Sequence, residues 1–242
     1  MRRGVWIGLL AAVAFAAVVL VRLPAAWIIP AGRTQGCASV DGSLWSGGCT
    51  GLTVGGTPVG DVSWDLLPLR LLRGRLAAHV SVHGAANASA DVELGFAQRV
   101  TARNIVADAP LDPSLMPGVP PSLHGQAHLE LALVEIEHGI IMQLQGRIEA
   151  RNLEDRSDAN TPLGSFVLVF PGGSGEPVGK LHDLDGPLAL EGTLRLTRAP
   201  GFELEGLIAP RRGAAPAIVS NIRFLGSPDA SGRRPFSLSG TF

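Results

Sequence analysis

Apolar and polar residues alternate one by one over much of the chain after residue 50. From Leu188 to Leu196 every second residue is leucine or glycine, and after Pro200 the alternation resumes from Phe202 to Ile208. Because successive side chains of a strand point to opposite faces, this pattern predicts two antiparallel strands joined by a tight turn. The same alternation occurs in segments 76–82, 90–96, 140–148 and 236–242. We therefore expect about ten strands or more.

The interruptions of this pattern are informative as well. Between Leu129 and Glu137 the alternation slips by one residue, which predicts a β-bulge. Asp65–Leu72 could form one or two helical turns, although Pro68 limits them, and Leu111–Met116 could form another. No other stretch beyond the N-terminal segment sustains a helical period. The fold class expected is therefore mainly β, with antiparallel strands.

Each predicted strand has one apolar face and one polar face, so the sheet has a single apolar side. That side must be kept from water. Either a curved sheet folds over itself, as in a sandwich-like domain, or a ligand such as a lipid lies along the apolar face. The alternation does not distinguish these arrangements, and both remain open at this point.

The N-terminal segment has a different pattern. Val5 to Val21 is an uninterrupted apolar run that follows Arg2 and Arg3 and ends at Arg22. At about 1.5 Å a residue, a helix over this run spans about 25 Å, near the lower limit for a bilayer core. The paired arginines keep the N-terminus in the cytoplasm. We therefore expect a single transmembrane helix.

This interpretation divides the chain in two. Residues 1–29 are a cytoplasmic stub and transmembrane anchor, and residues 30–242 form a β-rich domain on the far side of the membrane. A cleaved signal peptide is the alternative. The small residues Ala14 and Ala16 fit a cleavage site, but they lie inside the apolar run rather than after it.

The cysteines agree with an exported domain. Cys37 and Cys49 are the only two, and both follow the apolar run. An oxidising compartment favours a disulfide between them, and the short loop that it closes would stabilise the fold by about 3 kcal/mol. The alternative is two free, buried thiols. Without a histidine pair at ligand spacing, zinc binding is not expected.

Composition and motifs exclude several functions. The chain is 46% hydrophobic and 17% charged with a net charge of −1, which fits neither a disordered chain nor a nucleic-acid-binding one. The stretch that ends in Gly179-Lys180 is not a phosphate loop, because Ser174 stands where a glycine is required. His124 and His128 would lie about 13 Å apart on one strand. We expect no catalytic residue, metal or cofactor, and hence no enzyme.

Two stretches carry a recognisable pattern. Residues 38–47 read ASVDGSLWSG, and residues 60–76 read GDVSWDLLPLRLLRGRL. They resemble the signature of the type II secretion system protein N family (general secretion pathway protein N). The positions that carry the resemblance are Gly42, Trp45, Gly47, Trp64, Pro68 and Gly74. AsmA-like envelope proteins share part of the first stretch.

The resemblance implies a function and a location. A member of this family would be a non-enzymatic accessory component of type II secretion in the bacterial inner membrane, and its periplasmic domain would contact platform proteins. The AsmA-like alternative implies a protein that holds or transfers lipid along an apolar sheet face. Trp45 and Trp64 either pin turns onto the sheet, or Trp45 is displayed to a partner.

Overall fold

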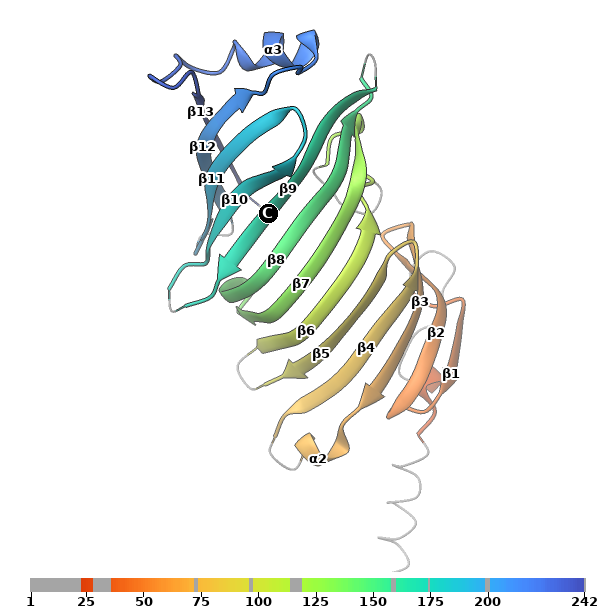
Figure 1. Cartoon of the computed structure of the whole chain (residues 1–242). Helices are drawn as coiled ribbons and strands as arrows, with labels where there is room; N and C mark the ends of the chain where they lie inside the picture. The colour runs from red at the N-terminus through yellow and green to blue at the C-terminus, as the bar shows by residue number, and fades with distance from the viewer. Residues whose placement is uncertain are drawn as a thin grey trace, which may run out of the picture.

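The computed structural model describes residues 23–27, 36–71, 74–95, 98–113, 119–157, 160–173, 175–198 and 201–241. These residues contain thirteen strands in one antiparallel sheet, and the strands follow one another across the sheet in sequence order. Figure 1 shows a single curved layer. The prediction of a mainly β, antiparallel and curved fold is confirmed. The sandwich-like alternative is wrong for the described residues, because they form one sheet.

The elements have the following bounds. The strands are β1 (Ser39–Gly42), β2 (Ser46–Val54), β3 (Thr57–Leu66), β4 (Leu76–Gly84), β5 (Asn87–Leu94), β6 (Arg99–Pro110), β7 (Leu123–Glu137), β8 (Ile140–Asp155), β9 (Thr161–Pro171), β10 (Val178–Asp185), β11 (Leu188–Thr197), β12 (Gly201–Pro210) and β13 (Arg234–Thr241). The helices are the short 3₁₀-helix η1 (Ala25–Trp27), α2 (Pro68–Leu71) and α3 (Pro216–Ile222).

The register between strands confirms the alternation read from the sequence. In the hairpin of β11 and β12, Leu194 lies opposite Leu204 and Leu196 lies opposite Phe202. The predicted bulge is also present, since the pairing of β7 with β8 shifts between Leu131 and Leu133 and again after Glu135. A shift of one residue exchanges the two faces, so these bulges keep the apolar residues of long strands on one side.

One apolar face therefore runs across the whole sheet, because residues directly opposite each other share a face. We call it the apolar face and define it by Val40, Cys49, Trp64, Val80, Val92, Ala102, Val134, Leu144, Leu168, Phe170, Leu181, Leu194, Leu204 and Leu238. Its best-buried part is a cluster of Leu131, Leu144, Phe170 and Leu196.

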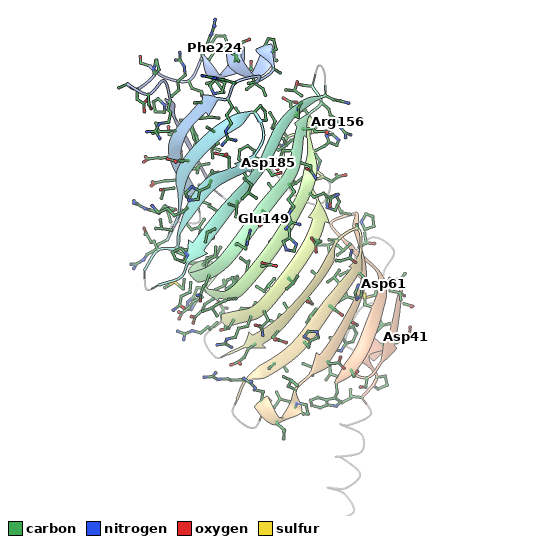
Figure 2. All side chains as sticks on the ribbon, viewed as in Figure 1. Asp41, Asp61, Glu149, Arg156, Asp185 and Phe224 are labelled. Carbon is green, nitrogen blue, oxygen red and sulfur yellow. A yellow bond between two sulfur atoms is a disulfide. The ribbon has the colours of Figure 1, made fainter. Side chains whose placement is uncertain are left out.

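The opposite, polar face holds its charges in ion pairs. Glu149 lies in the middle of the sheet and is buried (Figure 2). It accepts a hydrogen bond from Arg151 Nε at 2.6 Å and also contacts Arg147. The guanidinium groups of both arginines contact the buried carboxylate, while the two arginine side chains remain half-exposed.

Helix α3 was not predicted. It lies on the apolar face beyond the end of β12 (Figure 1), where Ile218 and Ile222 are buried against Leu188. The expectation of no further helical stretch is therefore wrong. The helix is only seven residues long, and two isoleucines one turn apart are too few to establish a period in the sequence.

The two predicted helical turns have different outcomes. Of Asp65–Leu72, the structure describes residues 65–71, in which Pro68–Leu71 is helical while Asp65 and Leu66 still belong to β3. Leu66 continues the sheet because its N–H donates to the carbonyl oxygen of Trp45 at 2.6 Å. At 111–116, residues 111–113 are not helical, and the rest lies outside the described residues.

The predicted anchor, Val5–Val21, and the alternative cleavage site also lie outside the described residues. Within the parts of the chain that the structure does describe, no helix has the length and apolar character needed to cross a membrane. The boundary between residues 1–29 and 30–242 stays a prediction.

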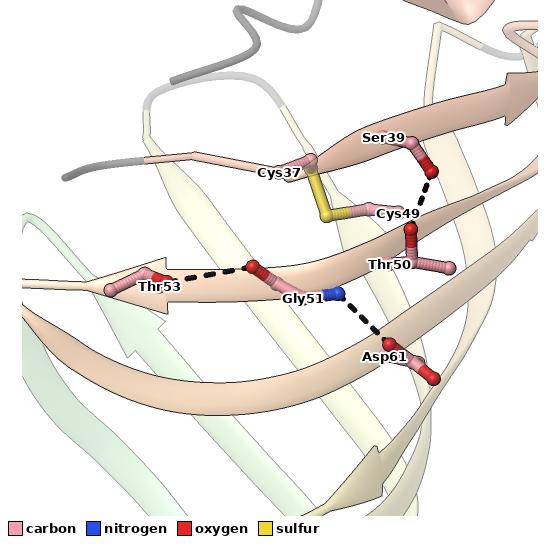
Figure 3. The surroundings of a disulfide bond; sticks show 7 residues. All are labelled: Cys37, Ser39, Cys49, Thr50, Gly51, Thr53 and Asp61. Carbon is pink, nitrogen blue, oxygen red and sulfur yellow. Dashed lines mark hydrogen bonds between the residues drawn. A yellow bond between two sulfur atoms is a disulfide. The ribbon is translucent and has the colours of Figure 1, made fainter. Parts of the chain in front are cut away.

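The predicted disulfide is confirmed. Cys37 and Cys49 are bonded with their Cα atoms 5.4 Å apart, and both side chains are buried. Figure 3 shows how the bond ties Cys37, two residues before β1, to the middle of β2, beside the hydrogen bond from Gly51 N–H to Asp61 Oδ1 at 2.9 Å. The disulfide therefore fastens the short edge strand β1 to the sheet.

Removing this bond should loosen the edge. In the double variant Cys37→Ala/Cys49→Ala, we expect the free energy of unfolding to fall by about 3 kcal/mol, because the unfolded chain loses a short closed loop. Urea denaturation of the oxidised chain and of the variant measures the difference. The reduced wild-type chain should behave like the double variant, and equal midpoints for oxidised and reduced protein would contradict the prediction.

Candidate functional site

The six residues of the sequence pattern come together at one end of β1–β4. Gly42 ends β1, Trp45 lies in the following turn and Gly47 is in β2, while Trp64 is near the end of β3. Pro68 begins α2, and Gly74 follows it. We call this end the motif rim and define it as residues 42–47, 64–71 and 74–76. The sequence pattern thus marks one contiguous region of the fold.

Trp64 fastens the turn between β1 and β2. Its Nε1 donates a hydrogen bond to the carbonyl oxygen of Leu44 at 3.1 Å. Gly47 is its direct partner across the strands, and a Cβ on Gly47 would lie 2.7 Å from Trp64 Cζ2 and 2.7 Å from the Asp41 oxygen. The indole ring therefore occupies the space that a side chain at position 47 would need.

Gly42 and Trp45 complete the same turn. Gly42 has a φ of +87°, and a Cβ there would lie 2.6 Å from the Ser46 oxygen, so glycine is required. Ser43 N–H donates to that oxygen at 2.9 Å. Trp45 is half-buried, and its carbonyl oxygen accepts the hydrogen bond from Leu66. The backbone of Trp45 thus links the turn to β3, while display of its side chain to a partner stays a prediction.

Pro68 and Gly74 delimit the segment that contains α2. Pro68 stands at the first helical position, where its missing N–H costs nothing. Gly74 has a φ of +69°, and its N–H donates to the Leu71 oxygen at 2.9 Å, which closes the helix. Leu67 N–H donates to the Ala77 oxygen at 2.8 Å. Backbone hydrogen bonds therefore join this segment to β4.

A buried carboxylate on the polar face also holds the segment. Glu93 of β5 accepts a hydrogen bond from Arg70 Nη1 at 2.9 Å and another from Arg75 Nη1 at 2.7 Å. Arg103 approaches to 3.9 Å. The hydrogen bond from Arg75, and then the charges of the three arginines, lower the pKa of Glu93. Glu93 therefore remains ionised and connects α2 to β5.

Beside Glu93 lies an open cavity of about 380 Å³. Its lining includes Arg75, Arg99 and Arg103 together with Glu93 and Glu135. Arg99 Nε lies 3.3 Å from Glu135 Oε1, so these charges are already paired with each other. Such a cavity offers charge recognition rather than an activated nucleophile.

The chain matches a known protein family over most of its length, including the motif rim. The family model described as type II secretion system (T2SS), protein N matches residues 33–237. The chain belongs to the type II secretion system protein N family. The resemblance stated from the sequence pattern is thereby confirmed. No curated protein and no solved structure shows a significant match to this chain.

Membership in the protein N family has direct consequences. It supports an accessory role in type II secretion, with an envelope location and with other components of the secretion system as partners. The family is a secretion component that is not known as an enzyme. These statements agree with what the resemblance implied, while the particular partners and the membrane topology belong to the proposal below.

The histidines considered from the sequence have local partners in the structure. His128 Nδ1 lies 2.7 Å from Asp108 Oδ1 and its Nε2 lies 3.2 Å from Glu130 Oε1. The hydrogen bond to Asp108, followed by that to Glu130, raises the pKa of His128. His124 Nδ1 instead lies 3.1 Å from the Ser122 oxygen. Across the described residues, no group of three or more His, Cys, Asp or Glu side chains could hold a metal.

Sequence reasoning identified the six pattern positions but not the contacts that hold them. Glu93 carried no signal beyond its place on a polar face, and its arginine partners lie 18 and 23 residues away in sequence. The exposed leucines of the α2 segment were read as part of a helical turn, not as a surface. The signal available for such a surface is that these leucines stand beside Arg70 and Arg75 in the sequence.

The pairing of Trp64 with Gly47 is testable with a neighbouring control. In Gly47→Ala the added methyl meets Trp64 and the Asp41 oxygen, so we expect the free energy of unfolding to fall by about 2 kcal/mol. In Gly48→Ala the nearest atom is the Val62 oxygen at 3.7 Å, and the change should stay within about 0.5 kcal/mol. Chemical denaturation followed by tryptophan fluorescence compares the two. Equal destabilisation would contradict this account of the turn.

Proposed function

We propose that this chain is a non-enzymatic accessory component of the type II secretion system in the bacterial inner membrane. Residues 1–29 contain the cytoplasmic N-terminus and a single bilayer span over Val5–Val21, and the thirteen-stranded sheet lies in the periplasm. The observation that carries the proposal is the match to the protein N family over residues 33–237. The run Val5–Val21 and the disulfide Cys37–Cys49 support the topology.

The two edges of the sheet differ in a way that favours one contact surface for platform proteins. Strand β1 has four residues, is fastened by the disulfide, and is followed by Ser43, which forms a bridge with Pro24. Strand β13 has eight residues and one neighbouring strand, β12, among the described residues. A long, unpaired edge accepts a strand from a partner. We therefore place the platform contact at β13.

Photo-crosslinking in cells tests this contact. Benzoylphenylalanine in place of Leu238 of β13, which is 57% exposed, should crosslink to inner-membrane platform components of the secretion system. The same substitution at Val54 of β2, which is 59% exposed, is the matched control and should not. Deleting the gene should reduce secretion of the system's substrates. Normal secretion in the deletion strain would refute the accessory role, whereas equal crosslinking at both positions would refute only the β13 contact.

A second candidate function is favoured by the apolar face. Among the described residues, α3 is the helix that packs on this face, while Leu94 and Leu238 of the face remain exposed. An extended apolar surface of this kind fits the acyl chains of phospholipids, so the chain would hold or transfer lipid, as AsmA-like envelope proteins do in the alternative considered above.

Lipid binding along this face is tested with the full-length chain. Cells that incorporate a phospholipid with a photoreactive acyl chain should yield crosslinked peptides from β4–β5 and β12–β13. Residues 1–29 should be crosslinked in any case if they span the bilayer, so they serve as the internal control. Crosslinks confined to residues 1–29 would exclude lipid binding by the sheet without affecting the role in secretion.

A further inference from the structure

The motif rim carries a group of exposed leucines. Leu67, Leu69 and Leu71 are 48%, 78% and 39% exposed, and Leu76 at the start of β4 is exposed as well. We call these four residues the leucine segment. Leu76 belongs to β4 and to the apolar face, opposite Leu94. Leu67, Leu69 and Leu71 instead lie in the connection between β3 and β4, where the alternation of the strands does not explain their exposure. We infer that the leucine segment inserts into the surface of the inner membrane.

The path of the chain brings the membrane to this rim. The carbonyl oxygen of Leu23 accepts a hydrogen bond from Leu44 N–H at 2.9 Å, and Pro24 forms a bridge with Ser43. Leu23 is thus fixed at the turn of the motif rim. Two residues of chain reach at most about 7 Å, so a bilayer span that ends at Val21 places the membrane surface beside this turn. This step rests on the anchor in the proposed function.

The charges around the leucine segment suit a phospholipid surface. The side chains of Arg70 and Arg75 are half-exposed and, together with Arg103, share the single carboxylate of Glu93. Three arginines around one glutamate leave an excess of positive charge beside the leucines. Leucines that enter the interface and arginines that reach head-group phosphates are the combination found in interfacial segments.

The leucine segment is also held in place before any membrane contact. The hydrogen bonds from Leu67 to Ala77 and from Gly74 to Leu71, and the ion pair of Arg70 with Glu93, hold the described residues 67–71 and 74 against the sheet. Little conformational entropy would then be lost on insertion. The membrane surface would meet a preformed, apolar projection of the sheet.

The same molecule offers a control position. Phe224, which follows α3, is 89% exposed. Figure 2 shows it at the opposite end of the molecule from α2, whose place is seen in Figure 1. Phe224 is a large apolar side chain with full access to any surface, yet the inferred orientation holds it away from the bilayer. A label at position 224 therefore distinguishes contact of the leucine segment with the membrane from nonspecific adsorption of exposed apolar groups.

The test uses the full chain with an environment-sensitive fluorophore. Leu69→Cys and Phe224→Cys are each labelled with a nitrobenzoxadiazole (NBD) dye under oxidising conditions, so that Cys37 and Cys49 stay bonded. The labelled chains are reconstituted into vesicles of phosphatidylcholine and phosphatidylglycerol, with and without brominated acyl chains. At position 69 we expect blue-shifted emission and quenching by brominated lipid several-fold stronger than at position 224.

Flotation of the vesicles in a density gradient distinguishes the possible failures. If the labelled chain floats with the vesicles but the label at position 69 is quenched no more than the label at 224, the leucine segment does not touch the membrane and the anchor is unaffected. If the chain does not float, the anchor is refuted, and the inference falls with it. Circular dichroism of both labelled variants should show the β-sheet spectrum of the unlabelled chain.

Discussion

The structure depends on hydrogen bonding between neighbouring strands of a single layer. A sandwich or a barrel buries its apolar side chains against a second layer or across a closed interior, whereas here the described strands form one open sheet. Apolar residues must therefore shield one another within the same face. The cluster of Leu131, Leu144, Phe170 and Leu196 does this over several strands. None of the large side chains among the described residues is fully enclosed, which is what a single layer allows.

Glycines paired with aromatic rings are the local solution to this lack of cover. Phe170 lies over Gly179, with 2.8 Å from its Cε1 to the site of a Cβ, and Phe236 lies over Gly206 at 2.7 Å. Trp64 and Gly47 repeat the arrangement at the motif rim. In each pair a ring covers the backbone of the next strand where that strand has no side chain of its own. Trp64 and Gly47 thus form, near the N-terminal edge, the same ring-and-glycine pair that recurs along the sheet.

The sequence predicted the strands well because their determinant is local. A period of two is visible in any short window, and the described strands β11 and β12 pair in the register that their alternation predicts, with Leu196 opposite Phe202. Three features escaped prediction, each for a different physical reason. The alternation of apolar and polar residues shows which side chains avoid water but not what covers them. The sequence therefore does not distinguish a single curved layer from a sandwich-like domain. Helix α3 is too short for a visible period, and the arginines that surround Glu93 come from separate segments. The sequence pattern of the family identified the residues of the motif rim. The contacts that hold these residues together cannot be derived from that pattern.

The order of the strands has a further consequence, for how the chain acquires its fold. Every strand in the described part of the chain pairs with its neighbours in sequence, so none of these thirteen strands must wait for a distant part of the polypeptide. Pairing of this kind involves short loops, which close quickly. A polypeptide that emerges from a translocation channel beginning with its N-terminal part can add one hairpin after another to a growing edge. Assembly then keeps pace with delivery, and the growing edge is the one that changes as each hairpin is added, while the β1 edge stays fastened by the disulfide.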